Sequence, residues 1–113
     1  MLREKGMFWY EYYDVKPKYN KGIKPLLRKI EKWLRKHDLV GDAFFCAPNV
    51  WTARGETYCT KSEAVIVFDG SSMYYMLNGM GYGRLNDEFY EFLQSEGYYL
   101  ELGCAWYGGL YKI

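Results

Sequence analysis

Few residues in this sequence have the types and spacing that nucleophilic catalysis or metal binding requires. His37 is the only histidine, so a Cys–His pair would have to combine it with Cys46, Cys59 or Cys104. Structural zinc needs four ligands with short spacings, whereas Cys46 and Cys59 are 13 positions apart. We therefore expect reduced, mostly buried thiols, no metal site and no cofactor.

Two glutamates, Glu11 and Glu101, are the candidates for acid–base catalysis. Each shares the face of an expected strand with aromatic residues, which are Trp9, Tyr13, Tyr99 and Tyr107. If those strands are neighbours, both carboxyl groups lie among rings, where burial raises a carboxyl pKa. Two solvated acids on a tyrosine-rich surface are the simpler interpretation, and we favour it.

A strongly basic segment suggests a second kind of chemistry. Residues 16–36 hold nine basic residues against one acid, a charge of +8, whereas residues 37–113 hold four basic and ten acidic residues, a charge of −6. A basic helix can bind a polyanion. The binding candidates are Lys24, Arg28, Lys32 and Arg35. Alternatively, the acids of a neighbouring helix partly neutralise this face, and we favour that interpretation.

The glycine-rich stretch GMGYGR at residues 79–84 precedes an expected helix. Such turns can bind phosphate through backbone amides. The spacing is not that of a dinucleotide or Walker motif, and Asp87 and Glu88 in the first helical turn would repel a phosphate. We interpret it as a flexible connection.

The stretch MFWYEYYDV at residues 7–15 predicts a strand with aromatic side chains on both faces. One set can serve the core, which leaves Trp9 and Tyr13, with Tyr99 and Tyr107, on an uncovered sheet face. Each aromatic residue buries about 150–250 Å², so this patch would reach or exceed the 300–600 Å² typical of a monomer. The pattern predicts an interface.

Hydrophobic periodicity and turn residues predict the elements that position these side chains. A helix is expected over residues 22–37 and another over residues 86–97, with Asn86 as its N-cap. Strands are expected over 42–48, 64–70 and 98–113, the last broken at Gly108 and Gly109, and a hairpin over 50–60. Residues 71–79 fit either a strand, which we favour, or a short helix capped by Ser72.

These elements predict one α+β domain over residues 1–113, with an antiparallel or mixed sheet and two helices on one face. The order indicates a ferredoxin-like, split βαβ plan with a β-rich middle. No apolar run could span a bilayer, and we expect a cytoplasmic protein. The first functional hypothesis is a non-enzymatic interaction protein that forms a homodimer. One alternative is a protein that binds single-stranded nucleic acid, and another is a small enzyme that uses Glu11 or Glu101. The possible partners, besides a second copy, are nucleic acid and an acidic protein.

Overall fold

The computed structural model describes residues 6–8 and 15–113. In chain order, the elements are α1 (Ile23–Lys36), β1 (Phe44–Cys46), α2 (Pro48–Ala53), β2 (Ala64–Val67), α3 (Met73–Leu77), α4 (Leu85–Ser95), β3 (Tyr98–Cys104) and β4 (Tyr107–Lys112). The four strands form an antiparallel sheet in the order β1-β2-β4-β3. The predicted α+β class is confirmed.

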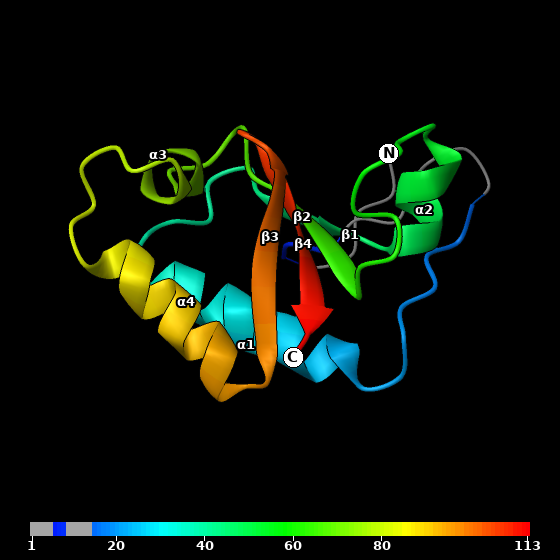
Figure 1. Ribbon diagram of the computed structural model, residues 1–113, viewed down its shortest axis with the longest axis horizontal. Coiled ribbons are helices and arrows are strands. Elements are labelled where there is room, and N and C mark those ends of the chain that lie inside the picture. The colour runs from blue at the N-terminus through cyan, green and yellow to red at the C-terminus, as the bar shows by residue number, and fades with distance from the viewer. Residues whose placement is uncertain (1–5, 9–14) are drawn as a thin grey trace.

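Successive side chains along each strand point to opposite faces of the sheet, which we call the inner and the outer face. Ile66 and Leu110 point to the inner face, whereas Val65 and Val67 point to the outer face. Every residue of β2 is buried, as expected for a central strand covered on both sides. Figure 1 shows α4 beside α1 on one side of the sheet and α2 on the other.

The inner face is covered by α1, α3 and α4. Helix α1 has the predicted bounds to within a residue, because its apolar residues recur at helical spacing and Pro25 lies in the first turn. The buried side chains of this helix are Ile23, Leu26, Leu27, Ile30 and Leu34. Phe89 and Leu93 of α4 join the same cluster. Two long helices therefore lie on one face, as predicted.

The outer face is covered by α2 and the loop at residues 54–63, where we expected a hairpin over 50–60. That prediction was wrong because Pro48 stands at the start of a helix, a position that tolerates a residue without an N–H. Trp51 of α2 is fully buried, and its indole Nε1 donates to the carbonyl of Tyr58 at 2.8 Å. Its ring lies 4.8 Å from that of Tyr107.

Residues 73–77 form helix α3, so the favoured strand was wrong and the alternative helix is correct. Ser72 makes no capping hydrogen bond from its side chain. The hydroxyl of Ser71 instead accepts from the Met73 backbone N–H at 3.0 Å and donates to the Leu39 carbonyl. Helix α4 likewise begins at Leu85 without a side-chain cap, so Asn86 is not its N-cap.

The C-terminal segment is a hairpin rather than one strand. The chain reverses at residues 105–106, and Gly108 and Gly109 lie inside β4 instead of breaking it. A small residue is needed at Gly109 because the outer-face loop lies close to β4. A Cβ on Gly109 would lie 2.9 Å from the Cβ of Ser62 and 3.0 Å from that of Cys59.

Most of the predicted strand at residues 7–15 lies outside the described residues. Of its described members, Met7 and Phe8 are both buried in the inner-face cluster. Phe8 forms an isolated parallel bridge to Phe45, and the Met7 carbonyl accepts from the Phe45 N–H at 2.7 Å. The ferredoxin-like plan is not confirmed, and α2 and α3 replace the predicted β-rich middle.

Candidate interaction surfaces

The predicted aromatic face is only partly present among the described residues. Trp9, Glu11 and Tyr13 lie outside them. Tyr107 was expected on the surface, but it is 5 % exposed and packs in the outer-face cluster under α2. That prediction was wrong because the sequence does not show that a helix covers this half of the face. Tyr99 is 43 % exposed, so it lies on the surface as expected.

Tyr99 and Tyr111 form a small aromatic strip on the part of the outer face beyond α2. Their rings stack with centroids 5.5 Å apart and planes 23° apart. The two residues are directly opposite on β3 and β4. The strip therefore lies beside the free side of β3. Tyr111 was not among the predicted site residues. Residues two positions apart on a strand share a face, so its position two residues after Gly109 on the last strand could have indicated it.

β3 is an edge strand whose outward backbone groups can be assigned from the register. The Ile113 N–H donates to the Gly97 carbonyl at 2.9 Å, which makes these two residues a hydrogen-bonded pair. Because such pairs alternate in an antiparallel ladder, Tyr99 and Glu101 bond to β4. The backbone groups of Tyr98, Leu100 and Leu102 therefore point away from the sheet. In Figure 1 no other element crosses in front of β3.

Glu101 lies beside this strip and is exposed, in agreement with a solvated acid. The Sγ atom of Cys59 lies 3.9 Å from the backbone carbonyl oxygen of Glu101. Burial raises the pKa of the Cys59 thiol and raises that of the Tyr111 phenol to about 12. Burial also raises the pKa of Cys46 to about 11. Neutral thiols are weak nucleophiles, so neither Cys59 nor Cys46 is activated.

The described part of the chain also contains no cluster of three or more His, Cys, Asp or Glu side chains that could hold a metal ion. Over the same residues, none of the helices combines the length and the apolar character that crossing a bilayer requires.

The four basic candidates on α1 differ in their surroundings. Arg35 pairs with Glu31 one turn earlier at 2.6 Å. The Lys24 ammonium and the Arg28 guanidinium each lie 5.8 Å from the centre of the Phe8 ring. Lys32 is exposed and makes no ion pair with a described residue. The ion pairs among the described residues therefore involve only some of these four side chains.

One ion pair connects the basic helix to the acidic one, as the intramolecular interpretation predicted. Lys29 of α1 and Glu96, immediately after α4, lie 3.0 Å apart. This pair is exposed, and such pairs are worth only about 0–1 kcal/mol.

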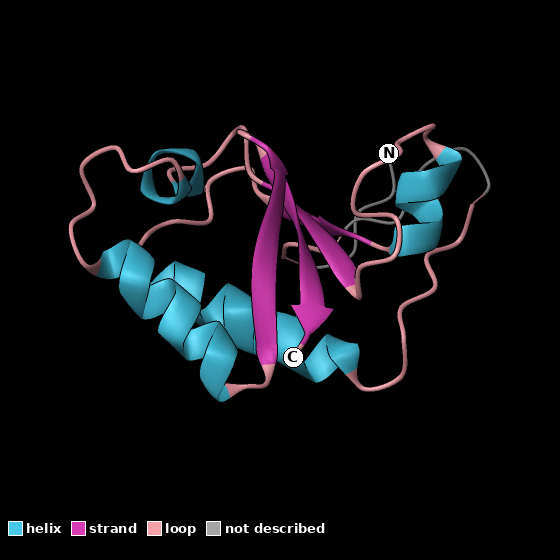
Figure 2. Cartoon of the chain, in the orientation of Figure 1, coloured by secondary structure: helices cyan, strands magenta, loops and turns pink. Residues whose placement is uncertain are grey.

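The basic helix and the aromatic strip lie on opposite faces of the sheet. α1 packs on the inner face, whereas Tyr99 and Tyr111 lie on the outer face. Figure 2 shows α1 and the sheet as separate layers. These tyrosines therefore cannot supply stacking rings next to the phosphate contacts of α1, which was the arrangement expected for a single-stranded nucleic-acid site.

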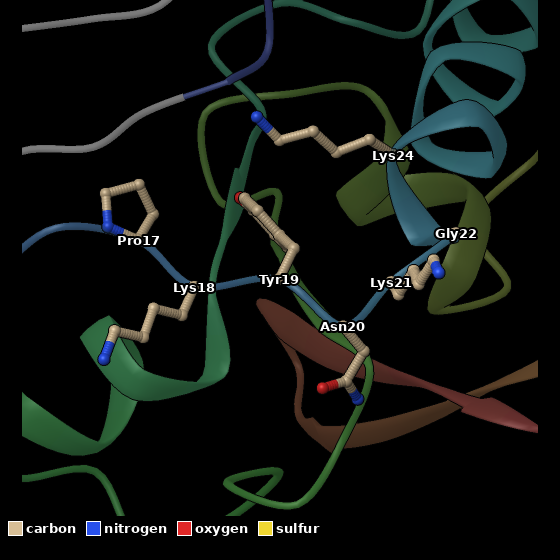
Figure 3. Close-up of a pocket in the computed structure, with 7 residues that line it drawn as sticks. All are labelled: Pro17, Lys18, Tyr19, Asn20, Lys21, Gly22 and Lys24. Carbon is tan, nitrogen blue, oxygen red and sulfur yellow. The ribbon is translucent and has the colours of Figure 1, made fainter.

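A hollow of about 590 Å³ precedes α1 and is formed by Pro17, Lys18, Tyr19, Asn20, Lys21, Gly22 and Lys24. Its segment is held in place by side-chain bonds. Asn49 of α2 accepts from the Lys18 N–H and donates to the Lys16 carbonyl, both at 2.7 Å. Figure 3 shows the amino groups of Lys18, Lys21 and Lys24 pointing in different directions. The lysines do not converge on one anion.

A comparison with known protein families, with curated proteins and with solved structures finds no match to this chain.

Proposed function

We propose that this protein is a non-enzymatic interaction module that self-associates by pairing β3 with β3 of a second copy. The observation that carries the proposal is the open edge of β3, with the backbone groups of Tyr98, Leu100 and Leu102 directed outward. An edge of this kind is a template for strand addition. The aromatic strip of Tyr99 and Tyr111 lies next to that edge.

The residues of β3 include few of the features by which proteins block an edge. Natural edges carry lysine, proline, inward-pointing charges or β-bulges. β3 has the sequence YYLELGC, in which Glu101 is the single charge, and an irregularity follows Leu102. Five residues of regular, mostly apolar or aromatic strand, Tyr98 to Leu102, therefore remain available to a partner.

The charge of Glu101 selects the register of the pairing. A two-fold axis at Leu100 aligns the outward backbone groups of both copies and places Tyr99 opposite Glu101 of the second copy. A two-fold axis at Glu101 would instead place two carboxylates directly opposite each other, which is destabilising. Closed two-fold dimers are the most common oligomers. We therefore expect a homodimer centred on Leu100.

Light scattering after size exclusion tests this proposal with Leu102→Pro and its control Leu102→Ala. Both changes remove the same partly buried side chain. Proline also removes an N–H that β4 does not use, so the internal ladder can persist while the edge is blocked. We expect a dimer for the wild type and for L102A at tens of micromolar, and a folded monomer for L102P.

A second pair of variants avoids the backbone altogether. Tyr99→Glu would place two glutamates opposite each other at both ends of the interface, whereas Tyr99→Gln loses the same ring without adding charge. We expect Y99E to dissociate the dimer more strongly than Y99Q. A monomeric wild type, or equal behaviour of Y99E and Y99Q, would refute β3 pairing.

A further inference from the structure

A groove lies between α1 and α4, on the side of the molecule away from the aromatic strip. It has a volume of about 420 Å³ and is lined by Lys29, Lys32, Trp33, Lys36 and Phe92. This volume is within the range of about 300–1,000 Å³ that small ligand sites show. The groove does not depend on β3, so an inference from it is independent of the proposed dimer.

The floor of the groove is aromatic, and the rings are already packed together. Trp33 stacks on Phe92 with centroids 6.0 Å apart and planes 9° apart. Phe89 and His37 pack against the same indole at 5.1 and 4.3 Å. A nucleobase would have to compete with these rings for the faces of Trp33. The floor suits an apolar side chain that contacts ring edges better than a base that needs a free face.

The rim of the groove is cationic and only partly neutralised. Lys29 is paired with Glu96 at 3.0 Å. Lys32 and Lys36 are exposed and form no ion pair with a described residue. They are four positions apart on α1, so they project from the same side of the helix. An anionic partner could therefore contact both lysines while an apolar group occupies the floor.

We propose that this groove binds an acidic peptide segment of another protein. One or more apolar side chains of the peptide contact Trp33 and Phe92, and its carboxylates lie against Lys32 and Lys36. Complementary charge supplies orientation and a fast approach, and burial of the apolar side chain supplies affinity. A charged polymer without apolar side chains would use only the rim.

Fluorescence anisotropy with three labelled probes tests this site. The first probe is a peptide of Glu, Asp, Leu and Phe; the second replaces Leu and Phe with Ser; the third is oligothymidine. We expect the first peptide to bind about tenfold or more tightly than the second, and more tightly than oligothymidine. Failure of the first peptide to bind, or tighter binding of oligothymidine, overturns the proposal.

Charge-reversal variants locate the binding. Lys32→Glu with Lys36→Glu should weaken the first peptide by about tenfold or more, because attraction becomes repulsion. The matched control is Lys61→Glu with Lys112→Glu, which makes the same change in net charge at exposed lysines outside the groove. We expect the control to change affinity by less than about threefold. Equal losses in both pairs would show non-specific attraction and overturn the site.

The apolar floor needs its own test because surface charge alone cannot establish it. Phe92→Ser should weaken the first peptide and leave the weak binding of the serine peptide unchanged. A thermal melt of each variant checks that the fold persists. If Phe92→Ser lowers the melting temperature, the Phe92→Leu variant, which keeps an apolar side chain, should still bind the first peptide. Equal affinity of F92S and wild type for the first peptide would overturn the proposal.

Discussion

The two faces of the sheet are both covered, but by very different amounts of structure. Among the described residues, twenty buried residues form the inner-face cluster and seven form the outer-face cluster. Long amphipathic helices cover the inner face, whereas a six-residue helix and a loop cover the outer one. The inner face therefore contributes most of the buried core, and the outer cover leaves Tyr99 exposed.

The packing of the outer face also relies on the close approach of the loop to the backbone of β4. Gly109 allows the loop that contains Cys59 and Ser62 to lie on β4. Trp51 is the largest fully buried side chain of this cluster, and its Nε1 hydrogen bond holds the loop at Tyr58. We infer that the outer layer can be altered with smaller losses of stability than the inner one.

The largest effect is expected from Phe89→Ala at the inner face. Phe89 is completely buried, and removing a buried phenyl ring costs about 3–5 kcal/mol of unfolding free energy. Urea denaturation measures this loss. Tyr58→Ala on the outer loop is the comparison, because its side chain is 67 % exposed and its loss should cost no more than about 0.5 kcal/mol. Similar losses for both variants would contradict the difference between the faces.

A pH-dependent loss of stability is expected from Cys46 in the outer cluster. Burial raises the pKa of Cys46 from 9.0 to about 11, so the folded state binds the thiol proton more tightly than the unfolded state. The resulting stabilisation is complete below pH 9 and is lost as the pH rises toward 11, by about 2–3 kcal/mol.

Urea denaturation at pH 8.5 and pH 11 measures this dependence in the wild type and in Cys46→Ala. The alanine variant should lose less stability over the same interval. Tyr111, whose pKa is raised to about 12, contributes equally in both proteins and cancels in the difference. Identical losses would show that the thiol is not buried under α2.

The smallest effect is expected from Gly109→Ala. The added methyl group would meet two Cβ atoms of the loop at 2.9 and 3.0 Å, so the loop must move. Overpacking of this kind costs about 1–3 kcal/mol. A thermal melt measures the cost, and the alkylation rate of Cys59 shows whether the loop has lifted. An unchanged melt together with an unchanged alkylation rate would contradict the close packing of the outer layer.

The sequence alone determined the elements that depend on local periodicity. Helix α1 could be predicted because its apolar residues recur at helical spacing around Pro25. Strand β2 could be predicted because AVIV is an uninterrupted apolar run with three β-branched residues. The position of Glu101 on a solvated face was also correct. These features follow from the covalent order of side chains and need no knowledge of neighbours.

Tertiary structure decided what covers each face. Residues 48–53 became a helix because Pro48 begins one and Trp51 has a buried site over Tyr107. The short segment at residues 73–77 became helical because the Ser71 hydroxyl caps it and Met73 reaches the inner core. Local patterning favoured a hairpin over the first segment and left the second open between strand and helix, so long-range burial selected both conformations.

For the candidate sites, some features could be predicted from the sequence and others could not. The exposed position of Tyr99 and the basic face of α1 follow from residue types and spacing. The burial of Tyr107, the open edge of β3 and the pairing of Trp33 with Phe92 depend on strand order and on which helices become neighbours. Those contacts join residues far apart in the chain, and the physical reason they escape sequence analysis is that packing, not local preference, brings them together.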